Sequence, residues 1–258
     1  MHQLKKKIVC IVMALALIFT GTEMFPVKNV VKGAAQNAPT NIHFSKNGNQ
    51  KTISWESVNG ATGYNVYRSS SRFETYSKIA TVSSTSYTDG TEGSYYYKVR
   101  TQLSSGESGD SDLTSEEIQL FGNNVYVFDK NDDMSQVQSL LTSTWNKQET
   151  NQFGSDRYAF YFKPGNYSSL DFYVGFYTQV SGLGLKPTDT HIGKMNCTAR
   201  WLGGDSNHNA TCNFWRMAEN LTVDSDIMWA TSQAVSLRRM QINGKLDLHD
   251  NGGWAHHR

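Results

Sequence analysis

Short runs of alternating apolar and polar residues fill the chain from residue 38 to residue 119. About six such runs recur, with Gly, Asn, Ser and Asp between them. Because every second side chain of a strand lies on the same face, Ile53 and Trp55 share one side, and so do Tyr64 and Val66. We therefore predict a β-sandwich with these four side chains in its core. The runs are NIHF, TISWES, GYNVYRS, SKIATV, TSYTD and SYYYKVRTQ.

A different pattern follows in DDMSQVQSLLTSTWNKQ, residues 132 to 148. Its apolar residues recur at helical spacing, and two acids stand at its start, where the helix dipole favours negative charge. The apolar positions are Met134, Val137, Leu140, Leu141 and Trp145. The pattern predicts one amphipathic helix whose apolar stripe covers the open end of the domain that follows.

The remainder of the chain consists of short strands and turns that recur about every 20 residues. The expected strand centres are Phe160, Val180, Trp201, Leu221 and Met240. Such a period is typical of a solenoid, in which each coil buries its inner face against its neighbours. In this arrangement NFWRMAENLTV (213 to 223) is one coil, and Asn220 stands at a bend where amide side chains of successive coils can form a ladder.

The first 35 residues have the features of a secretory signal peptide. Three lysines precede an apolar run from Ile8 to Phe19, and Gly33, Ala34 and Ala35 follow. An uncleaved anchor is the alternative, but 12 apolar residues are short against the roughly 20 that a membrane span needs. We expect cleavage after Ala35, a secreted, extracellular protein, and no association with the membrane after cleavage.

Charge argues against nucleic acid as a partner. Without residues 1 to 35, the 24 basic and 23 acidic residues become 19 and 22, because five lysines and one glutamate are lost. A chain with a net charge of about −3 and no basic stripe does not attract a polyanion.

Two cysteines remain after cleavage, and they leave two interpretations open. Cys197 and Cys212 either form a disulfide, as an exported protein allows, or stay as two buried thiols. Their spacing is too sparse for a zinc site. His249, His256 and His257 lie at the very end without an element to hold them, so no metal site is predicted.

The first domain resembles a known family. KTISWESVNGATGYNVYRSSS, TSYTD and GSYYYKVRTQLSSGES are similar to a fibronectin type III domain over residues 36 to 119, with Trp55 where the family has its core tryptophan. The resemblance implies a spacer or, as an alternative, a module that contacts carbohydrate weakly.

Residues 120 to 258 resemble a second family. KPGNY, SGLGL and AENLTV look like the first coils of a right-handed parallel β-helix of the pectin-lyase type, and residues 123 to 254 are similar to a family of secreted microbial β-helix proteins. The expected fold is all-β: a fibronectin type III sandwich plus an incomplete right-handed parallel β-helix with one N-terminal capping α-helix. The resemblance stops within a motif at Trp254, and no capping helix follows Leu248, so we expect a truncated product that lacks further coils.

Carbohydrate-cleaving β-helices generally use two or three carboxylates on one exposed sheet face. The candidates here are Glu219, Asp224 and Asp226. Asp224 and Asp226 would face the same side if a strand ran through both, but they also adjoin a turn, where a solvated role is favoured.

Two further side chains are candidates for substrate binding. Arg216, like Arg238 and Arg239, could hold a sugar acid, because a guanidinium binds a carboxylate bidentately. The alternatives for Arg216 are a surface strand position or an internal pair with Glu219. Tyr177 is a candidate groove aromatic, together with Tyr173, Phe176 and Trp201, although all of these could belong to the core.

These observations lead to two hypotheses of different class. The first is a secreted bacterial, polysaccharide-directed protein, a fragment of a glycoside hydrolase or polysaccharide lyase that is inactive alone. It needs no cofactor, although an intact relative could use calcium. The second is a non-enzymatic extracellular scaffold for carbohydrate binding or adhesion. An enzyme should show clustered carboxylates and exposed aromatics on one sheet face, whereas an adhesin should show a flat polar face.

Overall fold

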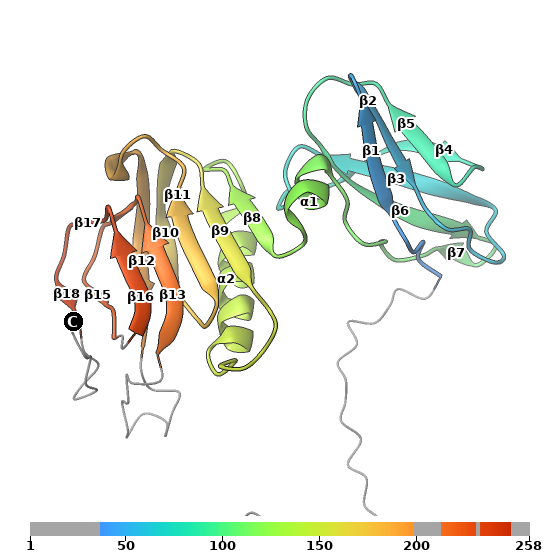
Figure 1. Ribbon diagram of the computed structural model, residues 1–258. Helices are drawn as coiled ribbons and strands as arrows, with labels where there is room; N and C mark the ends of the chain where they lie inside the picture. The colour runs from blue at the N-terminus through green and yellow to red at the C-terminus, as the bar shows by residue number, and fades with distance from the viewer. Residues whose placement is uncertain (1–36, 199–212, 231–232, 249–258) are drawn as a thin grey trace, which may run out of the picture. The chain divides into compact units, whose positions relative to one another are not determined.

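The computed structural model describes residues 37–198, 213–230 and 233–248, and these residues are mostly β (Figure 1). Several predictions fall outside them: the signal peptide, Trp201, the Cys197–Cys212 pairing through Cys212, and the three terminal histidines. Among the described residues, no helix has the length and apolar character that crossing a membrane requires.

The first part of the described chain is a sandwich of two antiparallel sheets. One sheet has the order β1-β2-β5, and the other has the order β4-β3-β6-β7. The strands are β1 (His43–Asn47), β2 (Gln50–Ser54), β3 (Gly63–Ser69), β4 (Ser77–Val82), β5 (Ser86–Asp89), β6 (Tyr96–Leu103) and β7 (Gly106–Glu107). The predicted sandwich is confirmed.

The sandwich core consists of the side chains that the alternating pattern selected. Ile53, Trp55, Tyr64 and Val66 are all buried and belong to one cluster, in which the Trp55 and Tyr64 rings meet edge to face with centroids 5.3 Å apart. The register of β1 and β2 pairs residues 47 and 50, so a two-residue turn joins them. Gly48 holds φ +58 in this turn, a left-handed conformation that glycine adopts without steric cost.

Two helices follow, whereas the sequence predicted one. Helix α1 (Glu116–Phe121) begins at Ser115, whose hydroxyl accepts a hydrogen bond from the Ile118 amide, and it crosses the expected domain boundary at residue 119. Six residues are too few to show a helical period, which is why the pattern missed it.

Helix α2 (Met134–Gln148) confirms the predicted amphipathic helix. The Asp133 carboxylate caps its first turn by accepting hydrogen bonds from backbone amides, including that of Ser135 at 2.9 Å. Val137 and Leu141 are buried in the core of the coils, and the helix packs against β10. It therefore covers the end of the stack where β8 and β9 lie, as expected (Figure 1).

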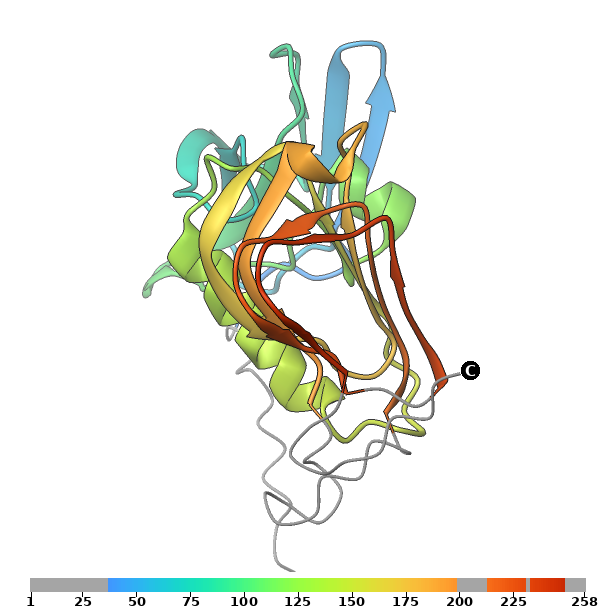
Figure 2. The same ribbon diagram turned by 90° about the vertical axis from the view of Figure 1, so that its left-hand side faces the viewer.

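The remaining strands form three parallel sheets, which the chain visits in turn. Sheet 1 has the order β16-β13-β11-β9-β8, sheet 2 has the order β10-β12-β14-β17, and sheet 3 pairs β15 with β18. Figure 2 shows how successive coils wind from one sheet to the next. The strands are β8 (Val125–Phe128), β9 (Tyr158–Phe162), β10 (Gly165–Tyr173), β11 (Thr178–Gly182), β12 (Thr190–Asn196), β13 (Phe214–Glu219), β14 (Thr222–Val223), β15 (Ile227–Met228), β16 (Gln233–Arg238), β17 (Gln241–Ile242) and β18 (Leu246–Asp247), with a 3-10 turn, η1 (Pro187–Asp189).

The register corrects the expected repeat. Tyr158 pairs with Thr178, Thr178 with Arg216, and Arg216 with Val235, so the offsets are 20, 38 and 19 residues. Because Thr178 pairs directly with Arg216, no strand of sheet 1 lies between β11 and β13. The strand expected at Trp201 therefore has no counterpart in sheet 1 between β11 and β13, and residue 201 itself lies outside the described ranges.

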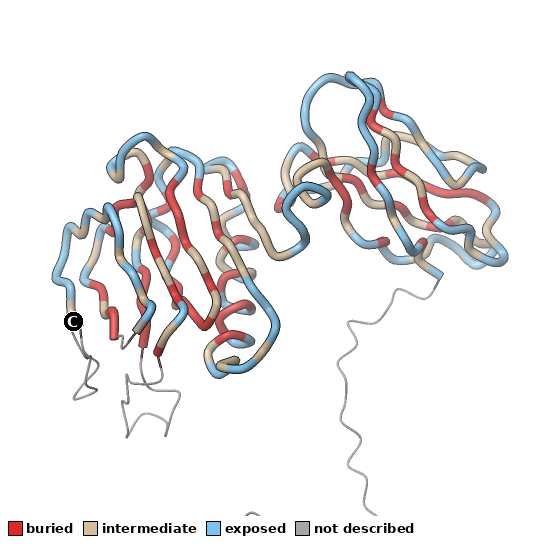
Figure 3. The backbone as a smooth tube through the Cα atoms, in the orientation of Figure 1, coloured by how far each residue is buried: buried red, intermediate tan, exposed pale blue. Residues whose placement is uncertain are grey.

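The core of the coils is aromatic and spans the sheets. Phe162 of β9 is wholly buried, with its ring centroid 4.7 Å from that of Phe128 in sheet 1 and 5.0 Å from that of Tyr167 in sheet 2. Figure 3 shows buried positions interspersed with intermediate and exposed ones along the strands. Packing of buried rings between coils and sheets therefore holds this domain together.

Asn220 stands at a bend, as predicted. Its φ is +55, and its side-chain amide donates hydrogen bonds to the carbonyls of Gly182 at 2.8 Å and Gly184 at 2.7 Å, both in the preceding coil. The register places Gly182 and Arg239 beside it in the neighbouring coils. The predicted amide ladder is thus wrong at this bend, where the Asn220 amide binds backbone instead.

Candidate functional site

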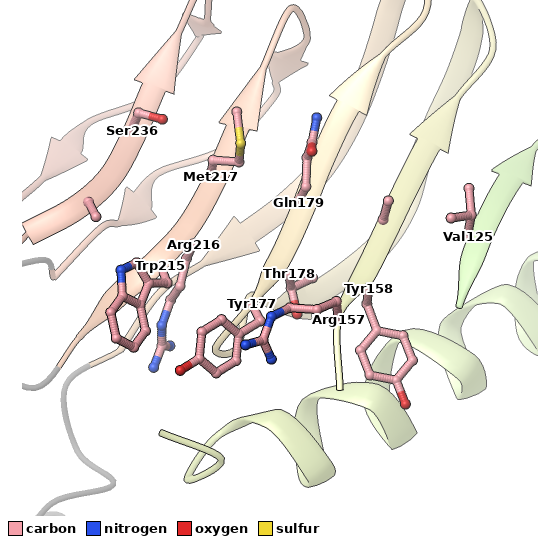
Figure 4. A pocket seen from close by; sticks show the side chains of 12 residues that line it. Val125, Arg157, Tyr158, Tyr177, Thr178, Gln179, Trp215, Arg216, Met217 and Ser236 are labelled. Atoms are coloured by element: carbon pink, nitrogen blue, oxygen red, sulfur yellow. The ribbon is translucent and has the colours of Figure 1, made fainter. Parts of the chain in front are cut away.

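A groove of about 590 Å³ runs over the outer face of sheet 1, near the N-terminal ends of its strands (Figure 4). Its lining is mainly apolar and aromatic, with a few polar groups. It is lined by Val125, Arg157, Tyr158, Ala159, Tyr177, Thr178, Gln179, Trp215, Arg216, Met217, Ala234 and Ser236. A concave, largely apolar surface with a few convergent polar groups is the usual form of a small-ligand site.

One column of side chains dominates this groove. The strand register places Arg157, Tyr177, Trp215 and Ala234 side by side, one from each successive coil of sheet 1. Parallel strands lie roughly 4.8 Å apart, so planar groups in such a column can stack face to face.

The stacking is present in the structure. The Tyr177 and Trp215 rings lie 5.1 Å apart at an angle of 19°, and the Arg157 guanidinium lies 3.4 Å from the Tyr177 ring centroid. Arg157 is held there by hydrogen bonds of 2.9 Å to the carbonyls of Gly154 and Asp156. The column is therefore an ordered cation–aromatic–aromatic stack on the sheet face.

The backbone aims these rings outward. Tyr177, Trp215 and Ala234 have φ values of +54, +55 and +49, which are uncommon for residues other than glycine. Phe176 and Thr178 on either side of Tyr177 are buried, so the Tyr177 ring lies on the outer face between two inward side chains. A left-handed residue costs about 1–2 kcal/mol, and strain of this kind is characteristic of functional sites.

The second outward column carries polar and flexible groups. Ala159, Gln179, Met217 and Ser236 lie in register beside the aromatic column. The Gln179 amide donates a hydrogen bond to the Ser181 hydroxyl at 3.1 Å, and its carbonyl oxygen is an acceptor. These groups give the groove a polar margin next to its aromatic floor.

Of the three predicted carboxylates, Glu219 shares this outer face. It lies at alternate positions with Trp215 and Met217 on β13, and its carboxylate accepts a hydrogen bond from Arg238 Nε at 2.8 Å. Arg238 belongs to the next coil, so the pair bridges coils. Glu219 is thus ion-paired with Arg238, and the alternative of an internal pair with Arg216 is wrong.

Asp224 and Asp226 lie elsewhere, in the turn between sheets 2 and 3. Strand β14 ends at residue 223 and β15 begins at residue 227, so no strand runs through the two acids. Asp224 contacts His191 Nδ1 at 3.1 Å and accepts from the Asn243 amide at 2.8 Å, while Asp226 accepts from the Lys245 backbone amide. The turn interpretation is confirmed, and the structure does not bring these acids to the face of Glu219.

Arg216 points into the stack. The residue is 1% exposed, and its guanidinium donates a hydrogen bond to the Val174 carbonyl at 2.8 Å and lies 4.4 Å from the Phe176 ring centroid. The expectation of a surface strand position for Arg216 is therefore wrong. Its Nε and Nη2 have no hydrogen-bond partner among the described residues. Binding of a sugar acid by this guanidinium stays a prediction.

The aromatic candidates divide between core and groove. Tyr177 lines the groove as predicted, whereas Phe176 is wholly buried and Tyr173 packs against Trp145 with ring centroids 5.2 Å apart. Trp215 and Arg157 were not among the predicted groove residues. Aligning the segments by coil register would have found them, since both then fall in the column of Tyr177.

The metal and disulfide predictions concern residues that the structure describes only in part. Within the three described ranges, no group of three or more His, Cys, Asp or Glu side chains is arranged to hold a metal ion. Cys197 is buried, and its predicted partner Cys212 lies outside those ranges, so the disulfide stays a prediction.

No family model matches the chain. An exo-beta-1,3-glucanase from Streptomyces sp. (strain SirexAA-E / ActE) is 47% identical over 139 residues, which are 52% of this chain and 22% of that protein. The solved structure of sacteLam55A from Streptomyces sp. SirexAA-E has 46% identity and a TM-score of 0.48 and covers 52% of this chain and 24% of that one. An Fn3-like protein from Clostridium thermocellum has 32% identity and a TM-score of 0.29 and covers 30% of this chain and 88% of that one.

The chain is therefore homologous over about half of its length to a carbohydrate-active enzyme, and it spans 22% of the length of that relative. This agrees with the coarser part of the sequence hypothesis, a polysaccharide-directed protein.

Proposed function

We propose that this chain is a secreted bacterial protein that binds β-1,3-linked glucan. In this proposal residues 1 to 35 direct export, the fibronectin type III domain is a spacer, and the coils are the N-terminal part of a right-handed, pectin-lyase-like parallel β-helix. The observation that carries the substrate class is the 47% identity to an exo-beta-1,3-glucanase.

The groove on sheet 1 supports binding. Exposed aromatic rings suit sugars, because the C–H face of a pyranose packs on a ring while its hydroxyls reach polar groups at the margin. Trp215, which is 46% exposed, supplies the open ring face, Tyr177 stacks behind it, and Gln179 and Ser236 supply polar groups beside them.

The placement of the carboxylates supports binding without cleavage by this chain alone. Glycoside hydrolysis requires two carboxyl groups that flank one bond. Glu219 is paired with Arg238 on sheet 1, and Asp224 and Asp226 lie in the turn between sheets 2 and 3. The proposal therefore combines the two hypotheses: homology to a glycoside hydrolase, with a binding role for the residues described. It requires no cofactor, and a calcium-dependent lyase role is not part of it.

Affinity electrophoresis of the purified chain tests the substrate class. Gels would contain laminarin as the β-1,3-glucan, with polygalacturonate and soluble starch as matched polysaccharides. We expect laminarin alone to retard the chain. Retardation by polygalacturonate instead would replace the glucan with an acidic polysaccharide.

Glucose release from laminarin by the same preparation tests the absence of cleavage. We expect release at the level of a buffer control after prolonged incubation. Release in proportion to the protein concentration would show that this chain is itself a hydrolase and would direct attention to Glu219.

A further inference from the structure

The aromatic column on sheet 1 stops one coil short. Arg157, Tyr177 and Trp215 fill three successive positions with planar groups, but the fourth position is Ala234, whose methyl group covers almost none of the indole face. Trp215 is accordingly 46% exposed although one of its faces stacks on Tyr177. We call the space beside Trp215 and above Ala234 the Trp215–Ala234 gap.

The gap belongs to the groove. Trp215, Ala234 and Ser236 all line it, whereas Phe214, which meets the indole at 84° with centroids 4.6 Å apart, is absent from the lining. Phe214 therefore meets the indole nearly at right angles and does not continue the column of parallel rings. The open volume lies where a fourth planar side chain would stand.

The geometry of the coil sets the size of what fits. Neighbouring parallel strands lie roughly 4.8 Å apart, and stacked rings contact at about 3.5–4.0 Å. One ring stacked on the open face of Trp215 therefore lies at the level of the next coil, in the place of a side chain at residue 234. The left-handed backbone of Ala234 points that place outward, as it does for Tyr177 and Trp215.

We propose that the Trp215–Ala234 gap is a subsite for one β-linked glucopyranose ring, which stacks on Trp215 as the missing member of the column. This inference rests on the proposed function and assigns its binding residue. Gln179 and Ser236, in the adjacent column, lie where they can hydrogen-bond the hydroxyls at the ring edge.

The linkage chemistry favours this sugar. In a β-1,3-linked glucose unit both glycosidic bonds are equatorial, so the chain leaves through the ring edge and each ring face presents only C–H groups. In an α-1,4-linked unit the bond at C1 is axial, so the neighbouring sugar projects from one face of the ring. A β-1,3-linked ring can therefore lie flat on the indole by either face, whereas an α-1,4-linked ring can do so by only one face, so the site favours the first geometry.

Filling the gap is the sharpest test. Ala234→Trp should complete the column, because Trp215 itself shows that this site geometry accepts tryptophan at a positive φ. We expect Ala234→Trp and Trp215→Ala each to weaken binding of laminarin, so that the dissociation constant measured by affinity electrophoresis rises by about tenfold or more. Phe121→Ala removes an exposed aromatic ring outside the groove and should bind as the parent does.

The outcomes separate the subsite from the proposed function. If the parent binds laminarin and Ala234→Trp binds it equally well, the subsite is wrong and the proposed function stands. The subsite is also wrong if only Trp215→Ala weakens binding, because the ring then stacks elsewhere. If the parent binds a different β-linked glucan through Trp215 and Ala234, the β-1,3 assignment fails and the subsite stands. Binding to starch, or to no polysaccharide at all, overturns the subsite. Circular dichroism of each variant confirms folding. If Ala234→Trp does not fold, Trp215→Ala, at an exposed position, remains the test, and unchanged binding of laminarin by that variant overturns the subsite.

Discussion

The sandwich and the coils bury their apolar side chains by different means. In the sandwich the strands pair antiparallel, some through a short turn, as β1 and β2 do around Gly48, and others over a long separation, as Gly63 and Gln102 do. In the coils, each strand pairs in parallel with a segment 19 to 38 residues away, as Thr178 does with Arg216. The two regions therefore differ in strand direction and in the presence of hairpins: the sandwich has both hairpins and long-range pairs, whereas every strand pair of the coils is parallel and long-range. The outward columns that form the groove exist only because the register of these parallel pairs is kept.

Removal of a ring from the coil core should have the largest effect on stability, and that effect should be confined to the coils. Phe162→Ala leaves a cavity among rings of sheets 1 and 2, and we expect a loss of about 3–5 kcal/mol in the free energy of unfolding. Hydrogen exchange followed by mass spectrometry should show faster exchange in β9, β10 and β11 and unchanged exchange in β2, β3 and β6. Val99→Ala, in the sandwich core, should show the reverse pattern. Equal acceleration everywhere in both variants would mean that the two regions unfold as one unit.

A substitution where the backbones of two neighbouring coils approach closely should have the second largest effect on stability. A Cβ added at Gly193 would lie 2.1 Å from the Ser168 carbonyl oxygen, and backbone cannot move aside as a side chain can. Gly193→Ala should therefore destabilise the coils by about 2–3 kcal/mol, measured by urea unfolding. Gly90→Ala is the matched control in the sandwich, since its Cβ would meet only the end of the flexible Gln50 side chain, at 3.2 Å. Similar losses for both variants would contradict the idea that coil contacts are the tighter ones.

A charged cluster in the sandwich should give the smallest effect and one that depends on pH. Burial by itself would raise the pKa of Asp89, but hydrogen bonds from Arg68, from Thr91 and from the Tyr97 hydroxyl outweigh it and lower the pKa well below its usual range. A lowered pKa in the folded state adds stability above the unfolded-state pKa of about 3.9, and this stability is lost as the pH falls through the folded-state value. Asp89→Asn should cost about 2 kcal/mol at pH 7.

Urea unfolding of Asp89→Asn and the parent between pH 7 and pH 2 measures this dependence. The difference between them should stay constant down to about pH 4 and narrow below it. Asp112→Asn changes an exposed carboxylate and should show no such trend. A difference that widened on acidification would mean that the Asp89 carboxylate does not stabilise the sandwich.

The sequence by itself determined the secondary structure wherever a side-chain period was local. Ile53 and Trp55 lie on one face because a strand alternates, and Val137 and Leu141 lie on one stripe because a helix repeats. Helix α1 was too short for such a period. The bend at Asn220 was also predictable, because asparagine tolerates the left-handed backbone that a bend requires.

Only the tertiary structure decided what lies beside what in the coils. The pairing of Thr178 with Arg216 places Trp215 against Tyr177, and the pairing of Arg216 with Val235 places Trp215 against Ala234. The tertiary structure also directs Arg216 inward. It separates Glu219, on β13, from Asp224 and Asp226, which follow β14. The physical reason is that parallel coils bring together residues that no local pattern connects. A single insertion resets the neighbours of every side chain on the sheet face without altering the alternation along its strands.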